Sequence, residues 1–74
     1  MNFQYIPKVG DVCVYKGPLQ IGGVSLDGVT VRCSMVNMSE DKLSSARFTC
    51  MDSELKGNVV WLNAKQIFWS IHKP

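Results

Sequence analysis

The side chains of this chain best suited to chemistry are three cysteines and one histidine. Thiolate and imidazole groups are ligands that zinc prefers, and Cys13, Cys33, Cys50 and His72 supply both types. Structural zinc sites usually take their ligands in pairs two to four residues apart. These four residues are widely separated, and the cysteine count is odd with no CxxC. We therefore expect no metal site and no disulfide framework, but three reduced thiols buried as small apolar side chains.

Catalytic arrangements are equally poorly supported. Cys50 with His72 would be a nucleophile and its base, but Cys50 lies in an alternating segment expected to face inward. The paired carboxylates, Glu40–Asp41 and Asp52 with Glu54, lie in polar segments where capping and solubility explain them. No glycine pattern matches a phosphate-binding loop. The sequence predicts a protein that is not an enzyme and that has no cofactor.

The basic residues offer one candidate binding strip. Eight Lys and Arg against six Asp and Glu give a net charge of +2, and the basic residues are spread evenly along the chain. Arg32 and Arg47 nevertheless fall on neighbouring predicted strands, on a face that also carries hydroxyl side chains. With an aromatic side chain beside it, such a strip could bind single-stranded nucleic acid. The alternative is an ordinary solvent-facing sheet, which is commonly rich in Thr, Ser and Arg.

The elements that must position these residues are short strands. Two alternating runs flank Asp27–Gly28, a pair typical of a type I′ hairpin turn. This turn would place Leu26 opposite Val29 and Val24 opposite Val31. Gly22–Gly23 is interpreted as a bulge or bend.

Alternation predicts further strands and the side chains that each turns inward. The expected strands cover 11–16, 24–26, 29–36, 46–51, 59–62 and 67–71. The inward positions include Val29, Val31, Cys33, Met35, Phe48, Cys50, Ile67, Trp69 and Ile71. Between the strands, 37–45 is expected to be a polar loop with a helical turn at Ser39–Lys42. Asn63–Gln66 is expected to form another helical turn, which Asn63 caps and Gln66 closes.

This order of elements resembles the SH3-like small-barrel superfamily, in the broad sense that includes KOW-like and Tudor-like members. The resemblance rests on Val9–Tyr15, on Gly23–Val24, on Val29–Arg32 and on Val60–Ile67, and it covers about 9–71. It implies an all-β fold: a small antiparallel barrel of five or six strands, with a short helical turn before the last strand. Members of this superfamily have many functions, so the likeness implies no particular activity.

The apolar residues of the C-terminal half exceed what one small core can hold. Val60 and Leu62 are expected inside, which leaves Val59, Trp61 and Phe68 on outer faces, together with Tyr15. A contiguous exposed aromatic patch usually marks a binding surface. The leading hypothesis is a module that binds a protein partner or self-associates as a homo-oligomer. A covering loop, or a strand face assigned one residue out of step, would be the alternative.

Length and composition set the remaining expectations. The 74 residues are predicted to form a single domain, 1–74, with an N-terminal arm over 1–8. No apolar run is long enough to cross a membrane, and no secretory signal pattern opens the chain. A cytoplasmic location and no membrane partner are therefore expected.

Overall fold

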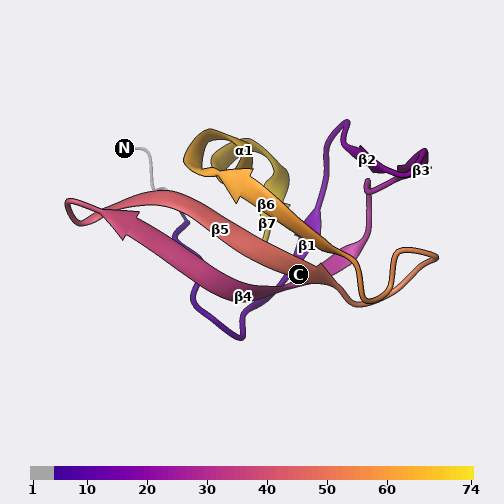
Figure 1. Ribbon diagram of the computed structural model, residues 1–74, viewed down its shortest axis with the longest axis horizontal. Helices are drawn as coiled ribbons and strands as arrows, with labels where there is room; N and C mark the ends of the chain where they lie inside the picture. The colour runs from indigo at the N-terminus through magenta and orange to yellow at the C-terminus, as the bar shows by residue number, and fades with distance from the viewer. Residues whose placement is uncertain (1–4) are drawn as a thin grey trace.

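The protein is built around one twisted antiparallel sheet. The computed structural model describes residues 5–74. Within them the elements follow in the order β1 (Val12–Tyr15), β2 (Gln20–Ile21), β3 (Val24–Ser25), β4 (Thr30–Ser39), β5 (Lys42–Cys50), β6 (Val59–Asn63), α1 (Ala64–Ser70) and β7 (Ile71–His72). The main sheet has the strand order β6-β5-β4-β1-β7, and β2 pairs only with β3 (Figure 1). The all-β prediction, with one short helix before the last strand, is confirmed.

The sheet is open where a barrel was expected. Its edge strands are β6 and β7, and no pairing joins them within residues 5–74. On the side of β1 away from β4, the chain returns as β7, which pairs His72 with Val14 and Ile71 with Tyr15. Residues 1–4 of the predicted arm lie outside the described residues.

The longest feature is the β4–β5 hairpin, which extends from the left end of the molecule past its centre in Figure 1. Its turn is Glu40–Asp41, where both residues have positive φ, 51° and 64°, and Ser39 pairs with Lys42. This is the backbone that a two-residue type I′ turn requires. The predicted polar loop with a helical turn at Ser39–Lys42 is therefore wrong. Near the tip both faces of the hairpin are largely exposed to solvent, so polar side chains there are compatible with paired strands.

A second primed turn lies at Gly22–Gly23 and not at the expected Asp27–Gly28. Gly22 and Gly23 have φ of 58° and 84°, and the strands they connect pair Ile21 with Val24. Glycine adopts positive φ without steric cost, so this pair suits the turn even better than Asp-Gly. The interpretation of Gly22–Gly23 as a bulge is wrong.

Asp27–Gly28 does form a turn, but the strands on either side of it, β3 and β4, do not pair with each other. The Val29 N–H donates to the Leu26 carbonyl at 3.1 Å, and of the two central residues only Gly28 has positive φ, 81°. The predicted hairpin with Val24 opposite Val31 is wrong, because Val31 pairs with Cys13 on one side and with Cys50 on the other.

A bulge in β4 reverses the expected alternation. The register passes from Cys33↔Phe48 to Met35↔Arg47, which leaves Ser34 as an extra residue. Beyond a bulge the two faces of the strand exchange places. Met35, predicted to face inward, is therefore exposed, and Val36 packs against the core instead.

The core lies on one face of the sheet, which we call the inner face. It takes one side of β1, β4, β5 and β6, and the helix α1 contributes Ile67. Its buried members include all three cysteines, each a free thiol, as predicted. Val29, Val31, Phe48, Leu62 and Ile71 are also buried, as expected.

The helix α1 replaces most of the predicted last strand. Asn63 caps it through a reciprocal pair of hydrogen bonds with Gln66, at 2.8 and 2.9 Å, which confirms the predicted cap. The helix then continues to Ser70 and buries Ile67 and Ser70. Ile67, Ser70 and Ile71 follow the spacing of one helical face, so a strand over 67–71 with Trp69 inside is wrong. Trp69 is 67% exposed.

Candidate interaction surface

The register of the sheet defines a face opposite the core, which we call the outer face. One row across four strands reads Val12, Arg32, Thr49 and Val59, and the next reads Met35, Arg47 and Trp61. Paired residues in antiparallel strands project to the same side of the sheet. The arginines of the predicted basic strip and two of the predicted aromatic-surface residues, Trp61 and Val59, therefore lie on one surface.

Trp61 is held at its place on this face by its neighbour. It is 48% exposed and pairs across the strands with Arg47, whose guanidinium carbon lies 5.9 Å from the centre of the indole ring. The Arg47 Nε–H also donates to Ser34 Oγ at 3.0 Å, and that hydroxyl donates to the Arg47 carbonyl at 3.2 Å. The extra residue of the bulge thus orients Arg47, and Arg47 in turn supports the ring.

Apolar side chains surround the two arginines. Val59 is 54% exposed, and exposed apolar side chains continue across the same face and its rim at Val9, Val12, Met35 and Met51. Met, Trp and Arg are the residue types enriched in protein interfaces. Sequence reasoning did not include Val12 in this surface, although it follows from the alternation with Cys13: if Cys13 is buried, Val12 faces out.

A shallow hollow beside Arg32 adds relief to the outer face. It is lined by Val9, Arg32, Cys33, Ser34, Thr49 and Met51. Two backbone hydrogen bonds hold the segment before β1 along β4: the Gly10 N–H donates to the Cys33 carbonyl, and the Cys33 N–H donates to the Asp11 carbonyl, both at 2.8 Å. This places Val9 as one wall of the hollow, with Arg32 exposed at the opening.

Tyr15 does not belong to the surface, and its predicted outward position is wrong. It is 1% exposed, because it alternates with Val14 and shares the inner side of β1 with Cys13. Its hydroxyl accepts the Leu19 N–H at 3.2 Å, so the polar end of the ring is satisfied inside the protein.

Phe68 is exposed, as predicted, but it is not part of the outer face. It lies on α1, where its ring makes an edge contact with Trp69 at a centroid distance of 5.2 Å. The predicted proximity of Phe68 to Trp61 assumed two adjacent strands, and the helix removes that geometry. Val59, Trp61, Arg32 and Arg47 are the predicted site residues that the structure brings together.

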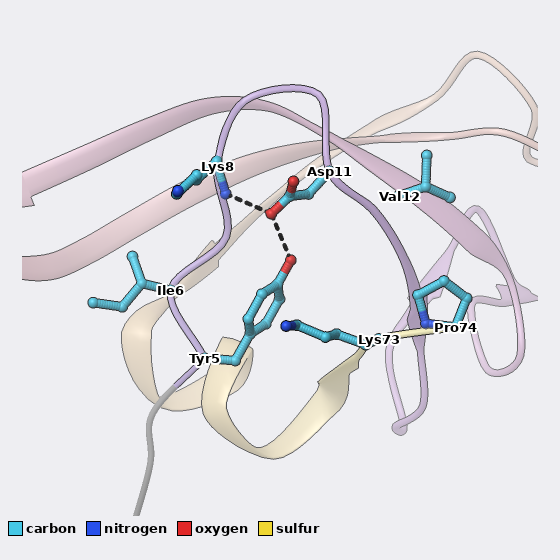
Figure 2. A pocket seen from close by; sticks show the side chains of 7 residues that line it. All are labelled: Tyr5, Ile6, Lys8, Asp11, Val12, Lys73 and Pro74. Atoms are coloured by element: carbon cyan, nitrogen blue, oxygen red, sulfur yellow. Dashed lines mark hydrogen bonds between the residues drawn. The ribbon is translucent and has the colours of Figure 1, made fainter.

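A second hollow lies between the N-terminal segment and the C-terminal residues (Figure 2). There the Tyr5 hydroxyl donates to Asp11 Oδ2 at 2.8 Å, and the Lys8 N–H donates to the same oxygen at 2.9 Å. These two hydrogen bonds, that from the Lys8 backbone first, lower the pKa of Asp11. The Lys73 ammonium lies 5.2 Å from the Tyr5 ring centre. These contacts fold the N-terminal segment back on Asp11 and bring Lys73 against the Tyr5 ring.

The cysteines show no arrangement for catalysis. Burial raises the pKa of Cys13, Cys33 and Cys50, which disfavours the nucleophilic thiolate. Among residues 5–74, no group of three or more His, Cys, Asp and Glu side chains is placed to hold a metal ion. In the same range, no helix has the length and apolarity to span a membrane.

Comparisons with protein-family models, with curated proteins and with solved structures give no match to this chain.

Proposed function

We propose that this protein is a non-enzymatic interaction module that binds a protein partner, or a second copy of itself, through the outer face. The surface centres on Trp61 and Val59, with Arg47 beside the ring. Phe68 of the predicted set would contribute only to a separate contact, because it lies on α1.

The observation that carries the proposal is the exposure of Trp61 and Val59 on a sheet whose other side already forms the core. A buried aromatic ring removes about 150–250 Å² from water, at roughly 25 cal/mol per Å². Because Trp61 is only 48% exposed, about half of this area remains to be buried, and the gain would be about 2–3 kcal/mol before the costs of association. Because Arg47 and Ser34 already hold the site, less side-chain freedom is lost on binding.

A second candidate function is the binding of single-stranded nucleic acid. It is favoured by one observation, the position of Arg32 and Arg47 on the same face as Trp61. Stacking on the indole and contacts from two guanidinium groups would supply the interactions. Such binding would weaken steeply with added salt.

The two tryptophans provide the test of the leading function. Trp61→Ala removes the ring from the outer face, and Trp69→Ala removes an even more exposed ring from α1. Self-association is followed by light scattering over a concentration series, and binding of foreign proteins by quantitative capture from cell extract. We expect Trp61→Ala to abolish the association and Trp69→Ala to leave it unchanged.

Loss of association in Trp69→Ala but not in Trp61→Ala would show that the binding surface lies on α1. An association that tolerates both substitutions would contradict the proposal.

A further inference from the structure

The charges on the outer face are of one sign. Its two rows contain Arg32 and Arg47 and no carboxylate. The six acidic residues of the chain all lie elsewhere. Asp11 accepts hydrogen bonds from Tyr5 and Lys8, Asp27 accepts one from the Gly17 N–H, and Asp52 accepts one from the Thr30 N–H. Glu40 and Asp41 form the hairpin tip, and Glu54 lies between β5 and β6.

The two arginines are spaced to meet a strand. Arg32 pairs with Thr49, and Arg47 lies two residues before Thr49 in β5. The two arginines are therefore diagonal neighbours about 7–8 Å apart. Same-side residues of an extended segment are also about 7 Å apart, at i and i+2. Trp61 lies directly opposite Arg47 on β6, about 5 Å further across the sheet, where its large ring is within reach of the next same-side residue of such a segment.

From this geometry we infer that the occupant of the outer face is an acidic extended segment of a partner protein, with carboxylates at i and i+2 and an apolar side chain at i+4. The carboxylates pair with Arg32 and Arg47, and the apolar side chain lies on Trp61. The inference rests on the proposed function and names its partner class.

The surroundings of the arginines support this occupant. Guanidinium groups pair with carboxylates through two parallel hydrogen bonds. Arg47 is preorganised by Ser34, and Arg32 stands at a hollow that Val9 and Met51 line with apolar side chains. Among residues 5–74, the two rows of the outer face contain one aromatic ring, whereas single-stranded nucleic acid binders stack successive bases on several. The balance of apolar area and charge therefore favours a peptide.

The experiment uses the full chain and blocked synthetic peptides. The probe contains Glu-Thr-Glu-Thr-Leu, its matched control contains Gln-Thr-Gln-Thr-Leu, and a labelled oligothymidylate is the nucleic acid arm. Affinities are measured by calorimetry for the wild type and for Arg32→Gln, Arg47→Gln, Trp61→Ala and Lys65→Gln. Lys65 is an exposed cation on α1, away from the outer face. Thermal unfolding checks that each variant is folded.

We expect the Glu peptide to bind, and each arginine substitution to weaken it about tenfold while Lys65→Gln has no effect. Raising the salt concentration from about 50 to 500 mM should weaken it further.

Three outcomes would overturn the inference. The Glu peptide fails to bind, the Gln peptide binds equally well, or oligothymidylate binds more tightly with the same dependence on Arg32. If both peptides bind equally well and Trp61→Ala abolishes their binding, the acidic partner is excluded but the proposed function still stands. Failure of the inference can thus be told apart from failure of the proposed function.

Discussion

At the scale of single residues, the tightest constraint surrounds Tyr15. Its ring is fully buried, and a Cβ placed on Gly17 would lie 2.6 Å from the Tyr15 hydroxyl oxygen and 2.9 Å from Ser70 Oγ. Gly17 is needed here for space and not for an unusual backbone. The chain leaves β1 against the ring of Tyr15, the last residue of that strand, and the Lys16 N–H donates to the Ser70 carbonyl at 2.8 Å, which joins β1 to the end of α1.

Gly17→Ala is accordingly expected to destabilise the protein by about 1–3 kcal/mol, the usual cost of overpacking. The change is measured as a shift in the urea midpoint. The double variant Gly17→Ala with Tyr15→Phe removes the shortest contact, so it should lose less than the sum of the two single variants. Full additivity would contradict the steric explanation.

Asp11 is the residue that should govern stability in acid. Its folded-state pKa is lowered, chiefly by the Lys8 N–H and then by the Tyr5 hydroxyl. The carboxylate thus stabilises the fold above its unfolded pKa of about 3.9, and this contribution is lost as the pH falls through the folded value.

Asp11→Asn should therefore lower stability at neutral pH and flatten the loss of stability between about pH 5 and pH 2. Urea unfolding across this range provides the measurement. Glu54→Gln, in an exposed turn, is the control and should leave the acid profile unchanged. An Asp11→Asn profile parallel to that of the wild type would show that these hydrogen bonds contribute nothing.

At the scale of elements, the β4–β5 hairpin decides the shape of the outer face. Its bulge at Ser34 turns Met35 outward and provides the hydroxyl that orients Arg47. The backbone of the turn at the hairpin tip is strained. Glu40 and Asp41 have positive φ, 51° and 64°, although neither residue is glycine. A left-handed conformation costs most residues roughly 1–2 kcal/mol, and Asn and Gly adopt it more easily.

Replacing Glu40 with Asn and Asp41 with Gly should therefore stabilise the hairpin by about 1 kcal/mol. The urea midpoint should rise, and hydrogen exchange of the amides near the tip should slow. Ala at both Gly22 and Gly23, where φ is also positive, is the converse control and should destabilise β2–β3. A lower midpoint for the Asn-Gly variant would show that the tip is held by its side chains.

At the scale of the whole molecule, the buried thiols and Tyr5 set the alkaline limit of stability. Burial is the leading reason why the pKa values of Cys13, Cys33, Cys50 and Tyr5 are all raised. A group with a raised folded-state pKa stabilises the fold below its unfolded pKa, and the contribution is lost as the pH rises toward the folded value.

Stability should consequently fall as the pH rises above about 8.5, the pKa of an unfolded thiol. The free energy of unfolding is measured in urea from pH 7 to pH 10 under reducing conditions. Cys50→Ala removes one buried thiol, so its stability should be lower at pH 7 but should decline less steeply. A flat wild-type profile up to pH 10 would be incompatible with buried neutral thiols.

The sequence by itself determined which residues of most strands are buried. Alternation is a local property of an extended chain, so Val31, Phe48, Cys50 and Leu62 could be placed inside without knowing their partners. The Asn63–Gln66 cap was equally local. The exposure of Trp61 and Val59 followed from the same parity.

Only the tertiary structure decided how the strands pair and where the parity changes. The partners of Val31 lie in β1 and β5, far apart along the chain, and no local pattern near Asp27–Gly28 encodes them. The bulge at Ser34 shifts Met35 by one position, and a shift of one residue exchanges the two faces. Trp69 is exposed because α1 continues beyond the first turn that Asn63 caps. The packing of Ile67 and Ser70 against the sheet favours this helix over the predicted strand. Long-range packing thus brought Arg32, Arg47 and Trp61 onto one face, and it did so through contacts that no single segment specifies.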